Sequence, residues 1–187
     1  RELLKNAKQI YWYPSEVDVS IRPGWFYHSE QDKDVRTLEN LVNIYYQSVG
    51  CNSVLLLNIP PDKRGLIHET DAQRIKELSD YINKTFENNL LLQRNKKTQE
   101  YKIKPNSKFN TLLIQEDITK GQRIEEFSVE IYSEGQWKQI AKGTTIGYKR
   151  LLRFQDTQAE KLRIRINSTR AEANIKNVGL YYAEPIM

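Results

Sequence analysis

The pattern of hydrophobic and polar positions changes near the middle of this 187-residue chain. In the first half, residues 10–21 have the composition of a strand that passes into a loop at 24–34. Apolar residues then recur every three or four positions across 34–49, which predicts an amphipathic helix with one buried face. Gly50 follows where a helix C-cap glycine is expected.

A second strand and a second helix come next. The continuous apolar run at 54–57 is typical of a parallel strand that is covered on both faces. Thr70 and Gln73 fit a capping box at the start of the helix. The apolar stripe of this helix is formed by Ile75, Leu78, Ile82 and Phe86. The order strand–helix–strand–helix is the repeat unit of an α/β barrel or a doubly wound sheet.

Two such units do not make a stable domain. The strand at 54–57 needs hydrogen-bonded neighbours on both sides and helices on both faces. An eight-stranded α/β barrel takes about 250 residues, whereas this half of the chain spans residues 1–91. We therefore expect most of the sheet to come from polypeptide outside this chain.

The second half, residues 92–187, has a period of two. Phe127, Val129 and Ile131 alternate with polar residues, and the same alternation recurs at 162–166. Shorter apolar pairs predict further strands at 112–114, 152–154 and 178–180. Short strands separated by glycine turns predict an antiparallel β-sandwich, joined to the first half through the polar stretch 93–99.

Charge is distributed unevenly, although the net charge is only +5. Residues 1–91 hold 11 Lys and Arg against 13 Asp and Glu, and residues 92–187 hold 18 against 11. A basic half can attract polyanions, but these basic residues alternate with apolar ones, as a solvated sheet face requires. We therefore expect no nucleic-acid partner. No apolar run approaches the roughly 20 residues of a membrane helix, so we expect no membrane insertion.

Aromatic and acidic side chains gather around the first strand. Trp25 begins three consecutive aromatic residues and could pack within the fold or stack on the apolar face of a sugar. Glu16 and Asp18 lie two apart, so they point the same way in an extended strand. Retaining glycosidases need two carboxyl groups about 5–5.5 Å apart with the sugar between them. Two residues on one strand leave little room for it, so we expect this pair to bond sugar hydroxyls or to hold Arg22.

Three further polar residues are candidates for supporting the loops. Arg22 precedes a Pro-Gly turn, and we expect it to hold neighbouring loops in place. His28 is interpreted as a loop-anchoring donor, and Asn58, at the end of the apolar strand, could bond a loop backbone or a ligand. The only other histidine is His68, and two isolated histidines make a weak metal site, so no metal ligands are assigned. Cys51 is the single cysteine and excludes an internal disulfide.

Three motifs in residues 12–65 carry a resemblance to a known family. They are WYPSEVDVSIRPGWFYH, IYYQSVG and LLLNIPPDKRGLI, in this order. Together they resemble the end of the catalytic (β/α)8 barrel of family 29 glycoside hydrolases, the α-L-fucosidases. The closest similarity is to the branch that prefers α-1,3/1,4-linked fucose in branched glycans. Residues 92–187 resemble the C-terminal sandwich of these enzymes, a galactose-binding or discoidin-type module.

The resemblance implies a specific chemistry. It implies a retaining, cofactor-free hydrolysis through a covalent fucosyl-enzyme, with a fucosylated oligosaccharide or glycoconjugate as substrate. It implies that the Trp of SIRPGW, here Trp25, helps to wall the fucose pocket. The nucleophile and the acid/base of the family lie on earlier strands, so the resemblance implies no catalytic residue in this chain. The chain would need the remainder of the catalytic barrel as its partner and would be inactive alone. A periplasmic or extracellular location is also implied.

Two other functions remain open. The chain could belong to a non-catalytic carbohydrate-binding protein that acts through its sandwich. The basic second half could instead bind a polyanion such as a sulfated glycan, which would make retention on heparin fall steeply with salt.

Overall fold

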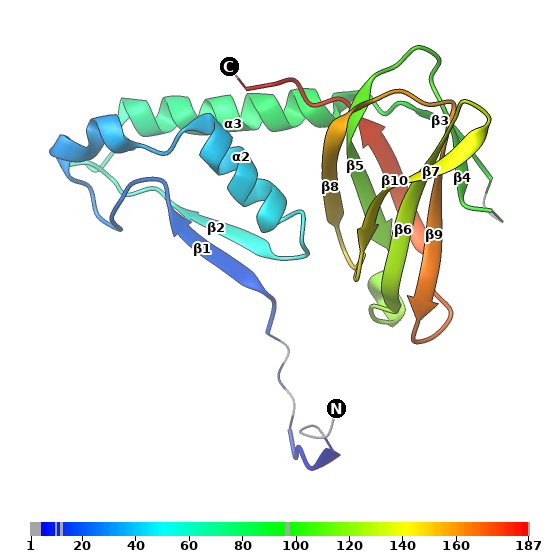
Figure 1. Ribbon diagram of the computed structural model, residues 1–187. Coiled ribbons are helices and arrows are strands. Elements are labelled where there is room, and N and C mark those ends of the chain that lie inside the picture. Colours follow the sequence, from blue (N-terminus) through cyan, green and yellow to red (C-terminus); the bar gives the residue numbers. More distant parts are fainter. Residues whose placement is uncertain (1–4, 10, 12, 96–97, 187) are drawn as a thin grey trace.

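The computed structural model describes residues 5–9, 11, 13–95 and 98–186 (Figure 1). Two helices and two strands form one side of the molecule, and strands form most of the other. The elements are, in order, β1 (Glu16–Ser20), the 3-10 helix η1 (Ser29–Asp34), α2 (Leu38–Gln47), β2 (Val54–Asn58), α3 (Glu69–Glu87), β3 (Leu91–Asn95), β4 (Glu100–Ile103), β5 (Phe109–Glu116), the 3-10 helix η2 (Ile118–Lys120), β6 (Ile124–Ser133), β7 (Gln136–Gly143), β8 (Arg150–Thr157), β9 (Lys161–Thr169) and β10 (Ile175–Tyr181).

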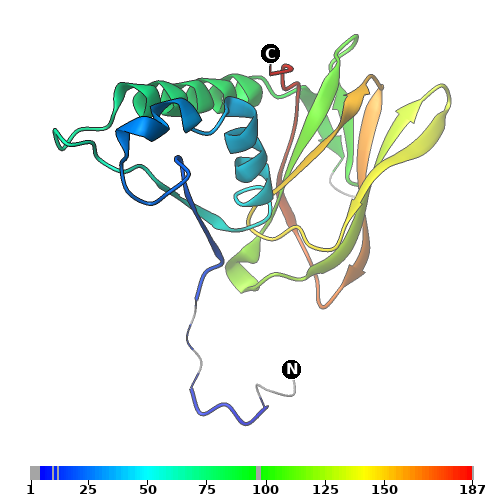
Figure 2. The same cartoon turned by 60° about the vertical axis from the view of Figure 1, so that its left-hand side comes forward.

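The predicted order strand–helix–strand–helix is present, with different boundaries. β1 and β2 pair in parallel, with Glu16 opposite Val54 and Ser20 opposite Asn58. Both α2 and α3 lie on the same side of this two-stranded sheet (Figure 2). The prediction of a strand over 10–21 is too long, because only Glu16–Ser20 pair with β2; residues 10 and 12 lie outside the described part.

The starts of both helices depend on side chains that cap them. α2 begins at Leu38 rather than near residue 34, because the Thr37 hydroxyl accepts the N–H of Asn40 and η1 occupies the preceding turn. The predicted capping box of α3 is wrong. The imidazole of His68 caps this helix by accepting the N–H of Thr70, so Thr70 lies inside the first turn. Neither described helix has the length and apolarity needed to cross a membrane.

The second part is a sandwich of two antiparallel sheets, as predicted (Figure 1). One sheet has the order β10-β5-β8 and the other β3-β4-β9-β6-β7. Their facing side chains form a buried core that includes Phe109, Phe127 and Leu162, all with no exposed area. The linker predicted at 93–99 is wrong in part, because β3 covers Leu91–Asn95 and already pairs with β4.

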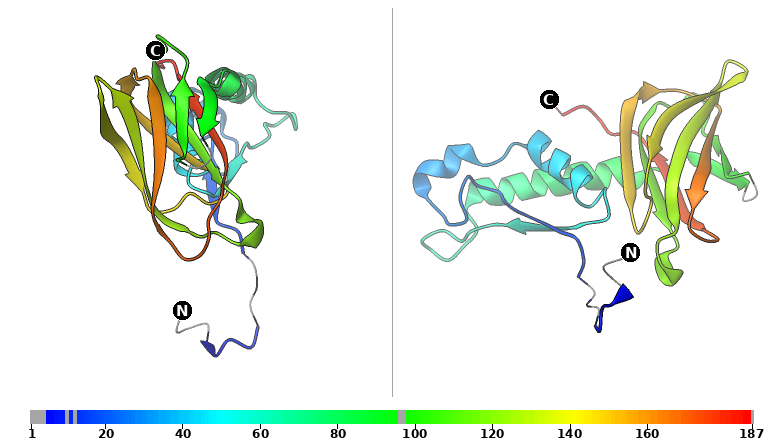
Figure 3. Two further views of the ribbon diagram at one scale, coloured as in Figure 1. Left: turned by 90° about the vertical axis from the view of Figure 1, so that its right-hand side faces the viewer. Right: turned by 60° about the horizontal axis from the view of Figure 1, so that its bottom comes forward.

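The two parts share a hydrophobic cluster. Leu151 and Leu113 of the sandwich pack into the cluster that holds Leu41 and Tyr46 of α2. The N–H of Leu151 also donates to the carbonyl of Gly50, 2.9 Å away. A Cβ on Gly50 would lie 2.3 Å from the carbonyl oxygen of Tyr46 and 2.9 Å from Leu151 Cβ. Glycine is therefore required here by close approach to the end of α2 and to Leu151 of the sandwich, rather than by an unusual backbone angle. Figure 3 shows the arrangement of the helices and the sandwich from two further directions.

Candidate functional site

One face of the two-stranded sheet is open in this chain. Side chains alternate in exposure along both strands, and the exposed ones are in register. Glu16 lies beside Val54, and Asp18 lies beside Leu56. Val54 and Leu56 keep 52% and 50% of their surface exposed, which is unusual for apolar residues in a parallel strand. This face combines two carboxylates with two uncovered apolar side chains.

The loop that follows β1 is fastened to the ends of both strands. Ser20 at the end of β1 donates to the carbonyl of Gly24, at 2.7 Å. Asn58 at the end of β2 donates from Nδ2 to the Trp25 carbonyl and to the Ser20 hydroxyl, each at 3.0 Å. The backbone of Gly24 and Trp25 is thus fixed by bonds from both strands, while the side chain of Trp25 keeps 50% of its surface exposed.

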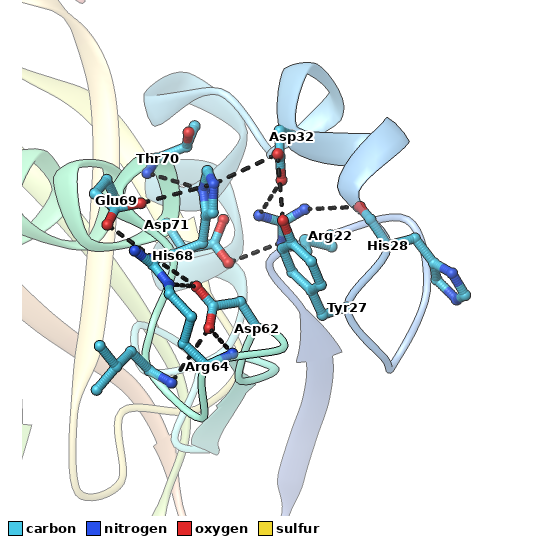
Figure 4. A network of polar contacts seen from close by, with 11 residues as sticks. Arg22, Tyr27, His28, Asp32, Asp62, Arg64, His68, Glu69, Thr70 and Asp71 are labelled. Carbon is cyan, nitrogen blue, oxygen red and sulfur yellow. Dashed lines mark hydrogen bonds and ion pairs between the residues drawn. The ribbon is translucent and has the colours of Figure 1, made fainter.

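A buried ion pair connects the same loop to α3 (Figure 4). The guanidinium of Arg22 has no exposed area, and its Nε donates to Asp71 Oδ2 at 2.8 Å. Its Nη2 lies 2.9 Å from Asp32 Oδ1, and its Nη1 donates to the carbonyl of His28 at 3.4 Å. Burial opposes the charged guanidinium, but the hydrogen bonds with Asp71 and Asp32 outweigh it and raise the pKa of Arg22.

Aromatic and imidazole rings cover this pair. The guanidinium carbon of Arg22 lies 4.7 Å from the ring centroid of Tyr27. The Tyr27 ring in turn packs against His68, with 5.7 Å between their centroids. His68 Nε2 is 3.4 Å from Asp32 Oδ2, while its Nδ1 caps α3. Because Nδ1 accepts a backbone N–H, Nε2 must carry the proton that faces Asp32.

The loop after β2 is rigidified by its own carboxylate. Asp62 accepts hydrogen bonds from the backbone N–H and the guanidinium of Arg64. These bonds lower the pKa of Asp62 to about 2. Arg64 also contacts Glu69 at 2.8 Å, which joins this loop to the first turn of α3. Between the two loops lies a hollow of about 240 Å³, lined mainly by polar side chains that include Tyr27 and His68.

The structure separates the candidate residues into two groups. Trp25 and Arg22 lie in the loop that Asn58 fastens, whereas Glu16 and Asp18 lie on the open face and make no contact with Arg22. The expectation that Glu16 and Asp18 hold Arg22 is therefore wrong. Asp71 and Asp32 hold it instead.

The prediction that His28 anchors the loop as a donor is wrong. Its carbonyl accepts from Arg22, and its half-exposed imidazole approaches Glu30 at 3.7 Å. Asp32, Asp62 and Asp71 were not predicted as site residues. The sequence feature that could have identified Asp71 is its position as a carboxylate in the first turn of a predicted helix.

The arrangement presents groups for binding rather than for bond cleavage. Trp25 offers an exposed ring, and Asp18 offers a carboxylate on the open face. The buried carboxylates are occupied by guanidinium groups. Within the described ranges, no group of three or more His, Cys, Asp and Glu residues could hold a metal ion.

Comparison with known proteins finds similarity to one family. The sequence profile of the Alpha-L-fucosidase family matches residues 2–87. The chain is 34% identical over 208 residues to alpha-L-fucosidase 1 of Arabidopsis thaliana, covering 91% of this chain and 41% of the relative. A rice relative gives the same identity, with 40% of its length covered. The chain thus spans about two fifths of these curated relatives.

Solved structures agree over nearly the whole chain. A provisionally named α-L-fucosidase from Bacteroides ovatus has a TM-score of 0.90 and 53% identity, covering all of this chain and 33% of that one. A glycoside hydrolase 29 family member from a rumen bacterium has a TM-score of 0.85 and 37% identity, covering 94% of this chain and 34% of that one. A Ruminococcus gnavus GH29 fucosidase, solved with fucose, has a TM-score of 0.83 and 27% identity, covering 95% of this chain and 43% of that one. The family match and the structural neighbours together support a C-terminal part of an α-L-fucosidase of glycoside hydrolase family 29.

Proposed function

We propose that this chain supplies the last two β/α units of a (β/α)8 barrel, and the sandwich that follows, to an exo-acting α-L-fucosidase. The open face of the β1–β2 sheet carries this proposal. In a barrel, this face is the interior and is filled by side chains from the other strands. Val54 and Leu56, half exposed here, would be covered in that way. The remainder of the barrel is then the first partner of this chain, with the division between barrel and sandwich near residues 91 and 92.

The substrate is a glycan with α-1,3/1,4-linked fucose. The active sites of such barrels lie at the C-terminal ends of the strands, where the loop that carries Trp25 is fastened. The exposed indole of Trp25 would stack on the apolar face of the fucose ring. Asp18 lies two residues before the end of β1, about 7 Å away, and Glu16 lies about 13 Å away at 3.3 Å per residue. Asp18 is therefore better placed than Glu16 to bond a sugar hydroxyl.

Hydrolysis needs groups that the rest of the protein provides. A retaining glycosidase uses a nucleophile and an acid/base on opposite sides of the scissile bond. In our proposal both come from earlier strands, and neither a metal nor another cofactor takes part. Residues of this chain bind the sugar and hold the loops. Loss of one proton-transfer group alone costs about 10²–10⁴-fold in rate, so the isolated chain should release no fucose.

Fucose release from an α-1,3/1,4-fucosylated oligosaccharide tests this function. A full-length protein that carries this chain should be active, and the 187-residue chain at equal concentration should not. In the full-length protein, Trp25→Ala should raise KM. The matched control Tyr148→Ala, which removes another exposed aromatic ring, should leave KM unchanged. Fucose release by the isolated chain, or an unchanged KM in Trp25→Ala, would contradict the proposal.

The sandwich itself remains the second candidate. Its two facing antiparallel sheets are compatible with a galactose-binding or discoidin-like module that binds glycans without cleaving them. The cluster shared by Leu151 and Tyr46 favours a bracing role instead, because the sandwich completes the core of the α/β part. A periplasmic or extracellular location belongs to the same proposal, since fucosylated glycoconjugates are found there.

A further inference from the structure

Two lysines face each other on the outer surface of the five-stranded sheet. Lys102 of β4 is paired directly with Lys161 of β9 in the antiparallel register. Their chain neighbours Tyr101, Ile103 and Leu162 are buried in the sandwich core, so both lysines point outward. Residues paired in this way have Cβ atoms about 4.5–5.5 Å apart, and like charges at that position destabilise the sheet.

The neighbouring arginines of this surface are paired with carboxylates, whereas the two lysines have no such partner among the described residues. Arg163 forms ion pairs with Glu130 and Glu100, and Arg165 also reaches Glu130 at 3.6 Å. In the part of the chain that the structure describes, neither lysine forms an ion pair. Lys161 only lies over the Tyr132 ring, 5.2 Å from its centroid. The paired positions therefore carry two ammonium groups, neither of which is neutralised by an ion pair with a described residue.

A hollow adjoins the pair and offers polar groups. Its volume is about 470 Å³, within the range of small-molecule sites. It is lined by Gln93, Arg94, Asn95, Glu100, Tyr101 and the two lysines. Its one carboxylate, Glu100, faces Arg163 at 3.8 Å, so the hollow is cationic. A neighbouring hollow of about 520 Å³ shares both lysines but contains the carboxylates of Glu134 and Glu160.

We propose that Lys102 and Lys161 form a binding site for the carboxylate or sulfate group of an acidic saccharide. Repulsion between paired like charges is relieved when an anion binds both, so the ligand replaces the missing counter-charge. Arg163 and Arg165, the next basic residues along β9, are paired with Glu130 and Glu100. The unpaired positive charge is therefore confined to the vicinity of the two lysines. It suits one anionic group rather than the long phosphate backbone of a nucleic acid. The choice of a saccharide rests on the proposed function in glycan processing.

Calorimetric titration of the 187-residue chain tests this site. The probes are 3′-sialyllactose, lactose sulfated at one hydroxyl, neutral lactose and a short oligouridylate. One or both acidic sugars should bind, more weakly at higher salt, and lactose should not. The sialylated and sulfated probes show whether carboxylate or sulfate is preferred. Lys102→Gln and Lys161→Gln should each weaken binding about tenfold, as expected for a lost charge-assisted bond.

A matched control and a second measurement keep the outcome clear. Lys176→Gln removes an exposed lysine from β10 in the other sheet and should not change binding. Without ligand, Lys102→Gln should unfold at a temperature no lower than the wild type, because a repulsion is removed. Absence of binding to both acidic sugars, equal binding to lactose, tighter binding of the oligouridylate, or unchanged binding in both lysine variants would overturn the proposal. Titration does not depend on fucose release, so failure of the fucosidase proposal would appear separately.

Discussion

Removing the carboxylate of Asp71 should destabilise this protein more than any single exposed charge would. Asp71 and Arg22 are both fully buried and 2.8 Å apart. Breaking a buried ion pair by removing one partner costs about 3–5 kcal/mol, because the other charge stays buried. Asp32 remains near Arg22 at 2.9 Å, so we expect Asp71→Ala to cost about 3 kcal/mol. At about 2–4 °C per kcal/mol for a chain of this size, the melting temperature should fall by roughly 6–12 °C.

Urea unfolding followed by circular dichroism measures this loss. Asp80→Ala is the matched control, because it removes a carboxylate from the same helix whose partner Lys76 is exposed. Such a surface pair contributes about 0–1 kcal/mol. The double substitution Arg22→Met with Asp71→Leu should recover most of the stability, since buried pairs can be replaced by apolar side chains of similar size. Hydrogen exchange of residues 22–34 should rise in Asp71→Ala, because the loop loses its link to α3.

Two results would refute this reasoning. One is a cost for Asp71→Ala that equals the cost for Asp80→Ala, which would mean that Arg22 is not buried with Asp71 in solution. The other is a double variant that is less stable than either single variant. That result would mean that the pair contributes through packing rather than through its charges.

Two further perturbations test other parts of the fold. The pKa of Asp62 is lowered to about 2 by Arg64, so its contribution is complete above the unfolded value near 3.9 and is lost as the pH falls toward 2. Unfolding free energies at pH 5, 4, 3 and 2 should therefore fall more steeply in the wild type than in Asp62→Asn, and equal slopes would contradict the assignment. Gly50→Ala should cost about 1–3 kcal/mol in urea unfolding, because its Cβ would overlap the carbonyl of Tyr46. Gly24→Ala, which meets nothing within 4 Å, should cost little, and equal losses would refute the close approach.

Local patterns in the sequence predicted the element types well. The alternation of apolar and polar residues around Phe127 and Leu162 predicted one buried face for each sandwich strand, and these apolar residues lie in the core. The three- and four-residue spacing before Gly50 reports a helix, and α2 is there. These signals work because each depends on neighbours within one element. The ends were less certain, because a cap such as His68 follows from its orientation and not from its residue type.

The polar site could not be assembled from sequence because its partners are distant along the chain. Arg22 and Asp71 are separated by 49 residues, and no periodicity relates them. A carboxylate in the first turn of a helix is ordinarily a solvated residue that favours the helix dipole. Only the packing of α3 against the loop after β1 turns Asp71 into a buried partner. Glu16 and Asp18 were nearer in sequence to Arg22, and proximity in sequence favoured the wrong pair.

The open sheet face shows how sequence and structure constrain function together. The apolar run at β2 predicted cover on both faces, and the structure provides helices on one face only. Val54 and Leu56 are therefore not covered within this chain, contrary to the prediction. They would be covered only if other strands were present. Burying the exposed half of each side chain would contribute about 1 kcal/mol, half of what full burial gives. The same strands would bring the catalytic carboxylates to the Trp25 loop. In the proposed barrel, stability and catalysis would therefore depend on the same neighbouring strands.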